Sequence, residues 1–200
     1  MNLKKGFTLV EMLVVIAVLS VLSLLILTIF TRTLRGGNKS QIIEAIKQNG
    51  QSVLEVMDKT IRNSDRVVCP LTTGTTIVSV KNGVYTKHRF VAPSGTISGY
   101  IQQETFNLPT SPPAGSNPSL YLRDFENTLC TDPMQNPQII TDTNPQSGVS
   151  VFNGLFTRTK SAGFKDQVTI KFDVRQGEQA PALVAGQIDP STFQTTILIR

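Results

Sequence analysis

The chain has 200 residues, 40% of them hydrophobic, and its 19 basic and 14 acidic side chains give a formal net charge of +5. Several of these charges lie in or beside one apolar N-terminal segment: Lys4, Lys5, Glu11, Arg32 and Arg35. Residues 38–200 hold 15 basic and 13 acidic side chains and are close to neutral, so the net charge does not indicate a nucleic-acid-binding domain. About 140 residues lie beyond the long N-terminal helix that contains this segment, enough for one domain with its own core.

Residues 12–31 contain no charged side chain. A helix of this length rises about 30 Å at about 1.5 Å per residue, which matches the hydrocarbon core of a bilayer. The segment is therefore predicted to span a membrane. Glu11 stands at its N-terminal end, where a carboxylate costs less than the roughly 2.5–3.5 kcal/mol of the bilayer centre but still needs a partner.

The residues around Glu11 resemble a known processing signal. An ordinary secretory signal has an apolar run of about 7–15 residues and a small-residue cleavage site after it; here the run is longer and no such site follows. A plain signal anchor would explain the length but not the glycine and the glutamate at the start of the run. The sequence KKGFTLVE at residues 4–11 resembles the N-terminal signal of type IV prepilins and of the pseudopilins of type II secretion.

The resemblance implies a maturation step. In this family a prepilin peptidase, an aspartic peptidase on the cytoplasmic face of the membrane, cuts after the glycine and methylates the new N-terminal amine. Carried onto this sequence, cleavage falls after Gly6 and N-methylation on Phe7. Residues 1–6 are then a leader peptide, and the prepilin peptidase is an expected partner.

The same resemblance gives Glu11 a role in assembly. Its carboxylate would lie in the first turn of the mature helix, where the macrodipole favours negative charge by about 0.3–1 kcal/mol. That gain offsets only part of the cost of burial in lipid. In the family this glutamate neutralises the amine of a neighbouring subunit, so Glu11 is expected to pair with Phe7 of another chain. The alternative is a passive acid that reaches the lipid headgroups.

The helix is predicted to continue beyond the membrane over residues 32–65. Apolar residues there follow a 3-4 spacing and form one stripe: Ile42, Ile43, Ile46, Val53, Leu54, Met57 and Ile61. Gly50 stands where a further apolar residue is expected. Gly36 and Gly37, each unfavourable inside a helix by about 1 kcal/mol relative to alanine, indicate either a kink or extendable point, or a linker that ends the first helix.

Residues 66–200 are predicted to form a β-rich globular head. The pattern alternates on both sides of Asn82-Gly83 over residues 75–91, which indicates a hairpin. Further strands are predicted at 148–158, 166–175 and 193–200, and the proline-rich stretches 107–119 and 130–138 are predicted to be loops. The fold class is α+β, with a long helix from residue 7, membrane-spanning to residue 31 and amphipathic beyond it, packed on an antiparallel sheet as in pilins.

The two cysteines, Cys69 and Cys130, both fall in the part that would be translocated, where a disulfide is favoured over two free thiols. It would close a loop of about 60 residues, worth roughly 4 kcal/mol in the loop-entropy model. The one histidine, His88, is predicted to lie on a strand surface without a metal-binding cluster or a nucleophile beside it. No metal, cofactor or enzymatic activity is therefore expected.

These features predict a structural subunit of a type IV pilus or of a type II secretion pseudopilus. The length and the terminal Ile-Leu-Ile-Arg resemble the larger minor subunits, including the J-type pseudopilin and its pilus counterpart, which implies initiation or a place at the tip; a major subunit is the alternative within the family. The expected topology is a single pass through the inner (cytoplasmic) membrane with the N-terminus in the cytoplasm, assigned from the processing signal because the flanking charges nearly balance. A second class of function is DNA uptake or adhesion through exposed loops, because basic and aromatic residues are interleaved over residues 85–90.

Overall fold

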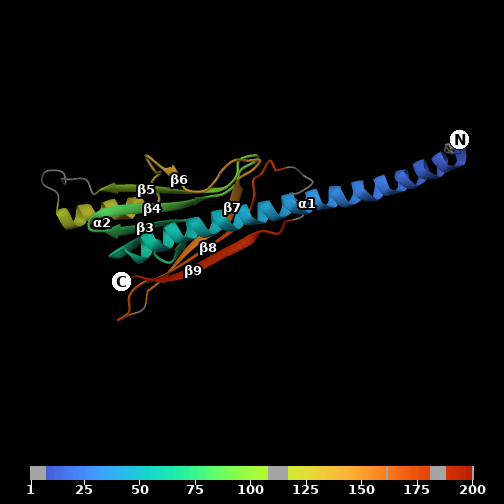
Figure 1. Cartoon of the computed structure of the whole chain (residues 1–200). Helices are drawn as coiled ribbons and strands as arrows, with labels where there is room; N and C mark the ends of the chain where they lie inside the picture. The colour runs from blue at the N-terminus through green and yellow to red at the C-terminus, as the bar shows by residue number, and fades with distance from the viewer. Residues whose placement is uncertain (1–7, 108–116, 161, 181–187, 200) are drawn as a thin grey trace. The chain divides into compact units, whose positions relative to one another are not determined.

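The computed structural model describes residues 8–107, 117–160, 162–180 and 188–199. Within these ranges the chain forms two helices, α1 (Leu9–Arg62) and α2 (Pro118–Leu129), and nine strands (Figure 1). The strands are β1 (Arg66–Cys69), β2 (Thr73–Gly74), β3 (Thr76–Lys81), β4 (Val84–Val91), β5 (Tyr100–Asn107), β6 (Gln138–Ile139), β7 (Val149–Thr159), β8 (Gln167–Gln176) and β9 (Ser191–Leu198). By its internal contacts the chain divides into an N-terminal unit up to Gln41 and a head unit from Ile42 onward.

The long helix is confirmed. α1 stays helical through Gly36 and Gly37, so the alternative in which this pair forms a linker is wrong. The helix ends where the side chain of Ser64 folds back and donates to the carbonyl of Ile61 at 2.6 Å. An ion pair four residues apart, between Asp58 and Arg62, lies on the last turn.

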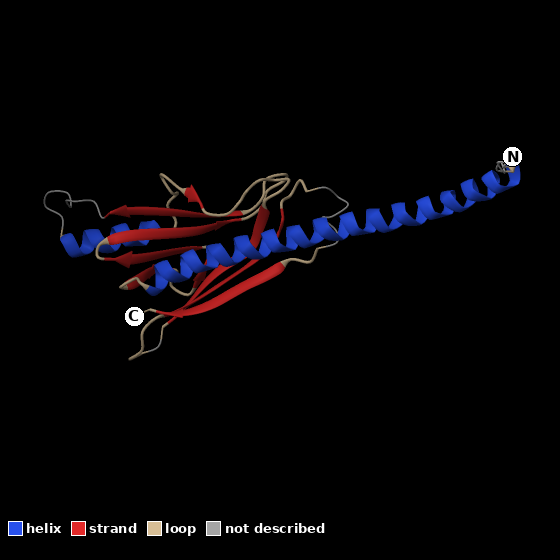
Figure 2. Cartoon of the chain, in the orientation of Figure 1, coloured by secondary structure: helices blue, strands red, loops and turns tan. Residues whose placement is uncertain are grey.

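The strands of the head unit form two antiparallel sheets (Figure 2). Sheet A has the order β1-β3-β4-β5-β6, and sheet B has the order β2-β7-β8-β9. The predicted hairpin around Asn82-Gly83 joins β3 and β4, and both residues have the positive φ that such a turn requires, 50° and 79°. The predicted α+β class, a long N-terminal helix with antiparallel sheets, is therefore confirmed.

The main core lies where the C-terminal half of α1 meets both sheets. The buried positions of α1 follow one face: Ile46, Gly50, Val53, Met57 and Ile61. From the sheets, the core receives Ile77, Phe90 and Ile101 of sheet A and Val151, Phe156, Val168, Ile170, Phe172 and Ile197 of sheet B. The predicted stripe thus forms the helical side of a core that ties the two sheets together.

Gly50 is explained by the aromatic ring that packs against it. A Cβ atom at this position would lie 2.2 Å from Cζ of Phe193 on β9, far inside normal contact. The same ring stacks on Phe172 with centroids 5.5 Å apart. The gap in the apolar stripe is therefore filled by a side chain of sheet B that packs directly on the helix, and it admits only glycine.

The head unit also contains a helix that the sequence interpretation missed. α2 begins at Asn117, whose side-chain oxygen accepts from the amide of Ser119 at 3.0 Å, and Pro118 occupies the first helical turn. The loop prediction for residues 107–119 is therefore wrong at its end, and residues 108–116 of that loop lie outside the described residues. α2 covers the second face of sheet A through a smaller core that includes Cys69, Val78, Val80, Tyr85 and Leu129.

The close contact at Gly50 generates a prediction. Gly50→Ala adds the helix propensity of alanine, about 1 kcal/mol, but overpacks the core against the Phe193 ring, which costs about 1–3 kcal/mol. We expect a net loss of stability by thermal or denaturant unfolding of the full chain in detergent. Ser52→Ala, on the exposed side of the same turn, is the matched control and should not destabilise.

The double variant Gly50→Ala/Phe193→Ala should lose less stability than the sum of its two single changes, because removal of the ring removes the clash. Stabilisation by Gly50→Ala alone, or strict additivity in the double variant, would contradict this account of Gly50.

Candidate functional site in the N-terminal helix

α1 begins with a reciprocal hydrogen-bonded turn around Glu11. Thr8 precedes the first helical residue, and its hydroxyl accepts from the amide of Glu11 at 3.3 Å. In return, Oε2 of Glu11 accepts from both the amide and the hydroxyl of Thr8, each at 3.3 Å. This arrangement is a capping box, which satisfies amides that the first turn of a helix otherwise leaves unpaired.

The capping box does not neutralise the carboxylate. Among the described residues no lysine or arginine forms an ion pair with Glu11, and the side chain is exposed. The described hydrogen bonds engage Oε2 alone, which leaves Oε1 able to accept from a group outside this part of the chain. The other two residues predicted for this site, Gly6 and Phe7, lie outside the described residues.

The helix that follows Glu11 presents apolar side chains on all its sides. α1 contains a stretch that is long and apolar enough to cross a membrane, and none of that stretch is buried. Its few polar side chains are satisfied within the helix: Ser20, Ser23, Thr28 and Thr31 each donate to the carbonyl four residues earlier, at 2.8–3.0 Å. A helix that satisfies its own polar groups while exposing apolar surface suits a lipid environment or contact with other apolar helices.

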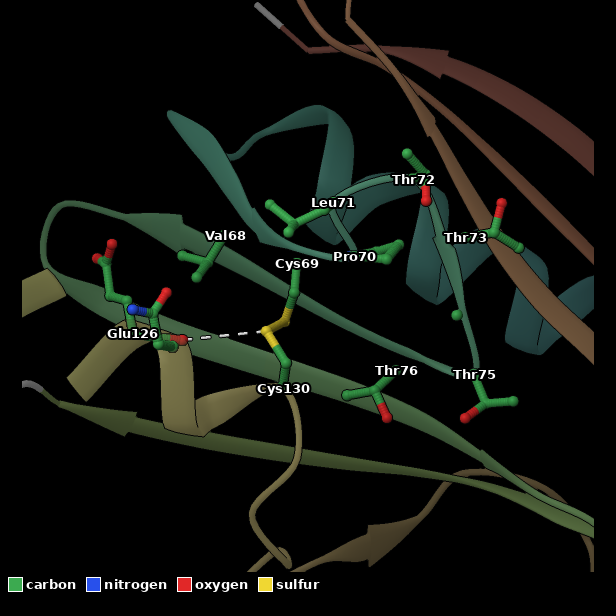
Figure 3. A pocket seen from close by; sticks show the side chains of 12 residues that line it. Val68, Cys69, Pro70, Leu71, Thr72, Thr73, Thr75, Thr76, Glu126 and Cys130 are labelled. Carbon is green, nitrogen blue, oxygen red and sulfur yellow. Dashed lines mark hydrogen bonds between the residues drawn. A yellow bond between two sulfur atoms is a disulfide. The ribbon is translucent and has the colours of Figure 1, made fainter. Parts of the chain in front are cut away.

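The predicted disulfide is present in the structure. Cys69 at the end of β1 and Cys130 at the end of α2 are joined, with their Cα atoms 6.0 Å apart. A cavity of about 430 Å³ lies beside the bond (Figure 3). Among the described residues that line it, Glu126 is the one with an ionisable side chain. Glu126 already binds Arg66 through both carboxylate oxygens and accepts from the hydroxyl of Tyr85 at 2.8 Å.

The contacts among Glu126, Arg66 and Tyr85 shift the pKa values of Glu126 and Tyr85. The hydrogen bonds from Arg66 hold the pKa of Glu126 below its usual value, against the effect of burial. Burial, and then the neighbouring Glu126, raise the pKa of Tyr85 to about 12. The carboxylate is thus held charged by its partners and ties α2 to β1 and β4, so the cavity offers no free general base from this residue.

The basic and aromatic side chains that are interleaved over residues 85–90 do not form an exposed surface. Lys87 is 1% exposed, and its Nζ donates to the carbonyl of Asp132 at 2.6 Å. Arg89 is half-buried and donates to the same carbonyl at 2.9 Å. These two cations lie at the C-terminal end of α2, where positive charge is favoured. The run therefore holds α2 on sheet A and is not presented to a nucleic acid.

The prediction of a surface histidine is wrong. His88 is fully buried on β4, opposite Ile77 of β3 and Gln103 of β5, on the same face as Phe90. Neither ring nitrogen has a hydrogen-bond partner of normal geometry among the described residues. Burial lowers the pKa of His88 to about 4, and the side chain of Gln103 opposes that shift only in part. The imidazole is therefore a neutral part of the core.

Comparison with known families identifies the N-terminal segment. Residues 1–27 match the family model for the prokaryotic N-terminal methylation motif. The matched residues include the predicted cleavage point, the capping box and most of the apolar run. No match was found among curated proteins or among solved structures. The motif match supports the resemblance of this N-terminus to the type IV prepilin and pseudopilin family.

The buried imidazole of His88 predicts a pH-dependent stability. The unfolded chain takes up a proton at this residue below about pH 6.5, whereas the folded chain does so only near pH 4. The free energy of unfolding should therefore fall as the pH drops from about 6.5 to 4 and level off below, by up to about 3 kcal/mol from this residue.

The test compares unfolding of the wild type with His88→Gln, which cannot titrate, from pH 7 to pH 4. Carboxylates such as Glu126 titrate in both proteins and cancel in the difference. The stability of the variant should approach or exceed that of the wild type as the pH falls. Two curves that stay parallel over this range would show that His88 does not titrate as a buried neutral group.

Proposed function

We propose that this chain, which carries a prepilin-type N-terminus, is a minor structural subunit of a type IV pilus or of a type II secretion pseudopilus. The motif match supports processing by prepilin peptidase and assembly with other pilin subunits. The observation that carries the proposal is the exposed carboxylate of Glu11, which forms no ion pair with any described residue. It stands at the start of an apolar helix whose surface the described residues leave uncovered.

Maturation follows from the motif. Prepilin peptidase cuts after Gly6 and methylates the amine of Phe7, so that the mature chain begins one residue before Thr8. The capping box then involves the second and fifth residues of the mature chain. Cleavage therefore leaves the turn that orients the Glu11 carboxylate intact and creates a new amine beside it.

Glu11 pairs with the Phe7 amine of a neighbouring subunit. In lipid an unpaired carboxylate and an unpaired ammonium group are both costly, and a contact between them relieves both. The capping box supports this role, because it occupies Oε2 and fixes the side chain while Oε1 stays available. Since each subunit carries one carboxylate and one amine at this level, the pairing sets the register of neighbouring helices.

The head lies outside the cytoplasm, with the N-terminus of the precursor on the cytoplasmic side of the inner membrane. The Cys69–Cys130 disulfide supports this topology, because disulfides persist in oxidising compartments outside the cytoplasm. The role in initiation or at the tip rests on the resemblance of β9 to a strand of the larger minor subunits.

Two variants separate the capping role of Glu11 from its role in assembly. Glu11→Gln removes the charge but keeps a side chain that can complete a capping box. Thr8→Val removes the hydroxyl of the box but keeps the carboxylate. If Glu11 pairs with another subunit, Glu11→Gln should reduce crosslinking to partner subunits at least tenfold, more than an exposed ion pair would account for. Thr8→Val should reduce it much less.

A membrane-fraction blot and a cleavage assay in the same cells show that both variants are inserted and cut. Removal of the charge should leave insertion intact or ease it. If Glu11→Gln is processed normally and crosslinks at the wild-type level, Glu11 is not the assembly contact. If Thr8→Val loses assembly while Glu11→Gln keeps it, Glu11 acts through the helix cap alone.

A further inference from the structure

The two sheets of the head have four edges, and one of them differs from the rest. β2 and β6, at one edge of each sheet, have two residues each. β1, at the other edge of sheet A, has four residues, an irregular register between Val67 and Cys69, and a proline directly after it. Short strands, bulges and prolines are the features by which proteins protect sheet edges from further pairing. β9, with eight residues in unbroken register with β8, has none of them.

The register of β9 identifies which main-chain groups face outward. Ile199 donates to the carbonyl of Asp166 at 3.1 Å, so these two residues form a hydrogen-bonded pair of the antiparallel ladder. Such pairs alternate along the strands, and every second residue of β9 from Ile197 back to Ser191 therefore bonds to β8. The N–H and C=O groups of the intervening residues point away from the sheet: Thr192, Gln194, Thr196 and Leu198.

Side-chain contacts agree with this register. The hydroxyls of Thr196 and Thr169 lie 3.0 Å apart, and the hydroxyl of Thr192 donates to Asp173 at 2.6 Å. Such close side-chain contacts are expected for residue pairs that share no main-chain hydrogen bond, because the Cα atoms of these pairs lie closer together. Outside the ladder with β8, no described residue bonds to the main chain of residues 192–198. The outer edge of β9 is thus a row of four free amides and four free carbonyls within the part of the chain that the structure describes.

The sequence of β9 does nothing to repel a further strand. Residues 191–198 read STFQTTIL and contain no charge and no proline. The four residues with outward main-chain groups are exposed, and Leu198, 63% exposed, adds apolar area at the end of the row. A long, uncharged edge of this kind pairs readily with another strand. In a chain that functions alone such an edge would be a liability, but in one that assembles with other chains it is a binding surface.

We propose that β9 is the docking site for an extended strand from the head of a different subunit in the same assembly, which continues sheet B by main-chain pairing. The proposal rests on the proposed function, because that function supplies the partner. Alternating donors and acceptors at the spacing of a strand are matched by another strand and by no other regular element. The uncharged side chains leave the partner free to carry either sign of charge.

The occupant is a different strand and not a second copy of β9 paired antiparallel with the first. Two β9 strands paired antiparallel are related by a two-fold axis perpendicular to the sheet. Since the C-terminal half of α1 packs on sheet B, that axis would reverse the direction of this half, and of the head that it belongs to, in the second copy. Copies inserted into one membrane in the same direction are not related by such an axis.

Hydrogen exchange on the full chain tests the edge directly. The peptide that covers residues 191–199 reports the exchange of the β9 amides. We compare its exchange between two states of the full chain: held in detergent micelles, and in the assembled fraction pelleted from cells. The amides of Thr192, Gln194, Thr196 and Leu198 should exchange quickly in micelles and at least tenfold more slowly in the assembly. Equally fast exchange in both states would overturn the docking site.

A pair of variants at one position tests whether the outward amide is needed. Gln194→Pro removes an amide that points away from β8 and so leaves the internal ladder intact, as edge prolines do. Gln194→Ala truncates the same side chain but keeps the amide. In the assembled fraction we expect at least tenfold less of the proline variant and an amount within about twofold of wild type for the alanine variant. Equal amounts of the two would overturn the proposal.

Photocrosslinking identifies the occupant. A benzophenone amino acid in place of Thr196 in the full chain should give an adduct to a strand in the head of another subunit, mapped by mass spectrometry. An adduct between two β9 strands would overturn the choice of partner. A wild-type chain that is absent from the assembled fraction would overturn the proposed function and this inference together, whereas a chain that is present with unprotected β9 amides would overturn this inference alone.

Discussion

The head depends on the burial of one face of α1 against both sheets. Ile46, Val53, Met57 and Ile61 are each at most 2% exposed, and burial of side chains of this size is worth about 1.5–3 kcal/mol each. Gly50 lies in the same row and admits the ring of Phe193, which brings sheet B onto the helix. Sheet A contributes its inner face to the same core. Without this helix each sheet would expose an apolar face.

The same helix must suit two different surroundings, and its sequence changes accordingly. Over residues 12–31 it is apolar on every side and satisfies its hydroxyl groups internally, as a segment in lipid requires. From Ile42 onward the apolar residues narrow to one stripe, and charged residues occupy the opposite side, as for a helix packed on one face. In the proposed function, polymerisation and head folding use separate stretches of one element, which explains why assembly variants such as Glu11→Gln are expected to leave the head intact.

The sequence predicted those elements whose signals are local. The α1 stripe follows from its spacing, and the hairpin follows from Asn82-Gly83, whose backbone conformation only a few residue types adopt. α2 was missed although Asn117-Pro118 is a recognisable helix start, because the apolar residues of the helix find their partners on β3 and β4, distant in sequence. The burial of His88 was missed for the same reason. A strand that is covered on one face alternates buried and exposed side chains. β4 is covered on both faces, by α1 and by α2, so side chains on both faces are buried, His88 among them.

The candidate site was predicted in part. The charge and position of Glu11 predict that it has a role. The Thr-x-x-Glu spacing at residues 8–11 is a further local signal, which predicts the capping box. The assignments of Gly6 as the cleavage point and Phe7 as the methylated residue remain proposals drawn from the motif. The edge of β9 could not be predicted, because a strand becomes an edge only through the order of its sheet, which depends on pairing between distant segments.

The central claim is that this chain is a prepilin-like subunit, and the proposed processing, membrane insertion and assembly all follow from that claim. The mass of the N-terminal peptide tests it most directly. The chain is isolated from the assembled fraction of cells that have an active prepilin peptidase, digested, and analysed by mass spectrometry. A processed filament subunit gives a first peptide that begins at Phe7 with one methyl group on its amine, and Gly6→Ala should slow its appearance. A first peptide that begins at Met1 on chains from the assembled fraction would contradict the assignment of this protein as a pilin-like subunit.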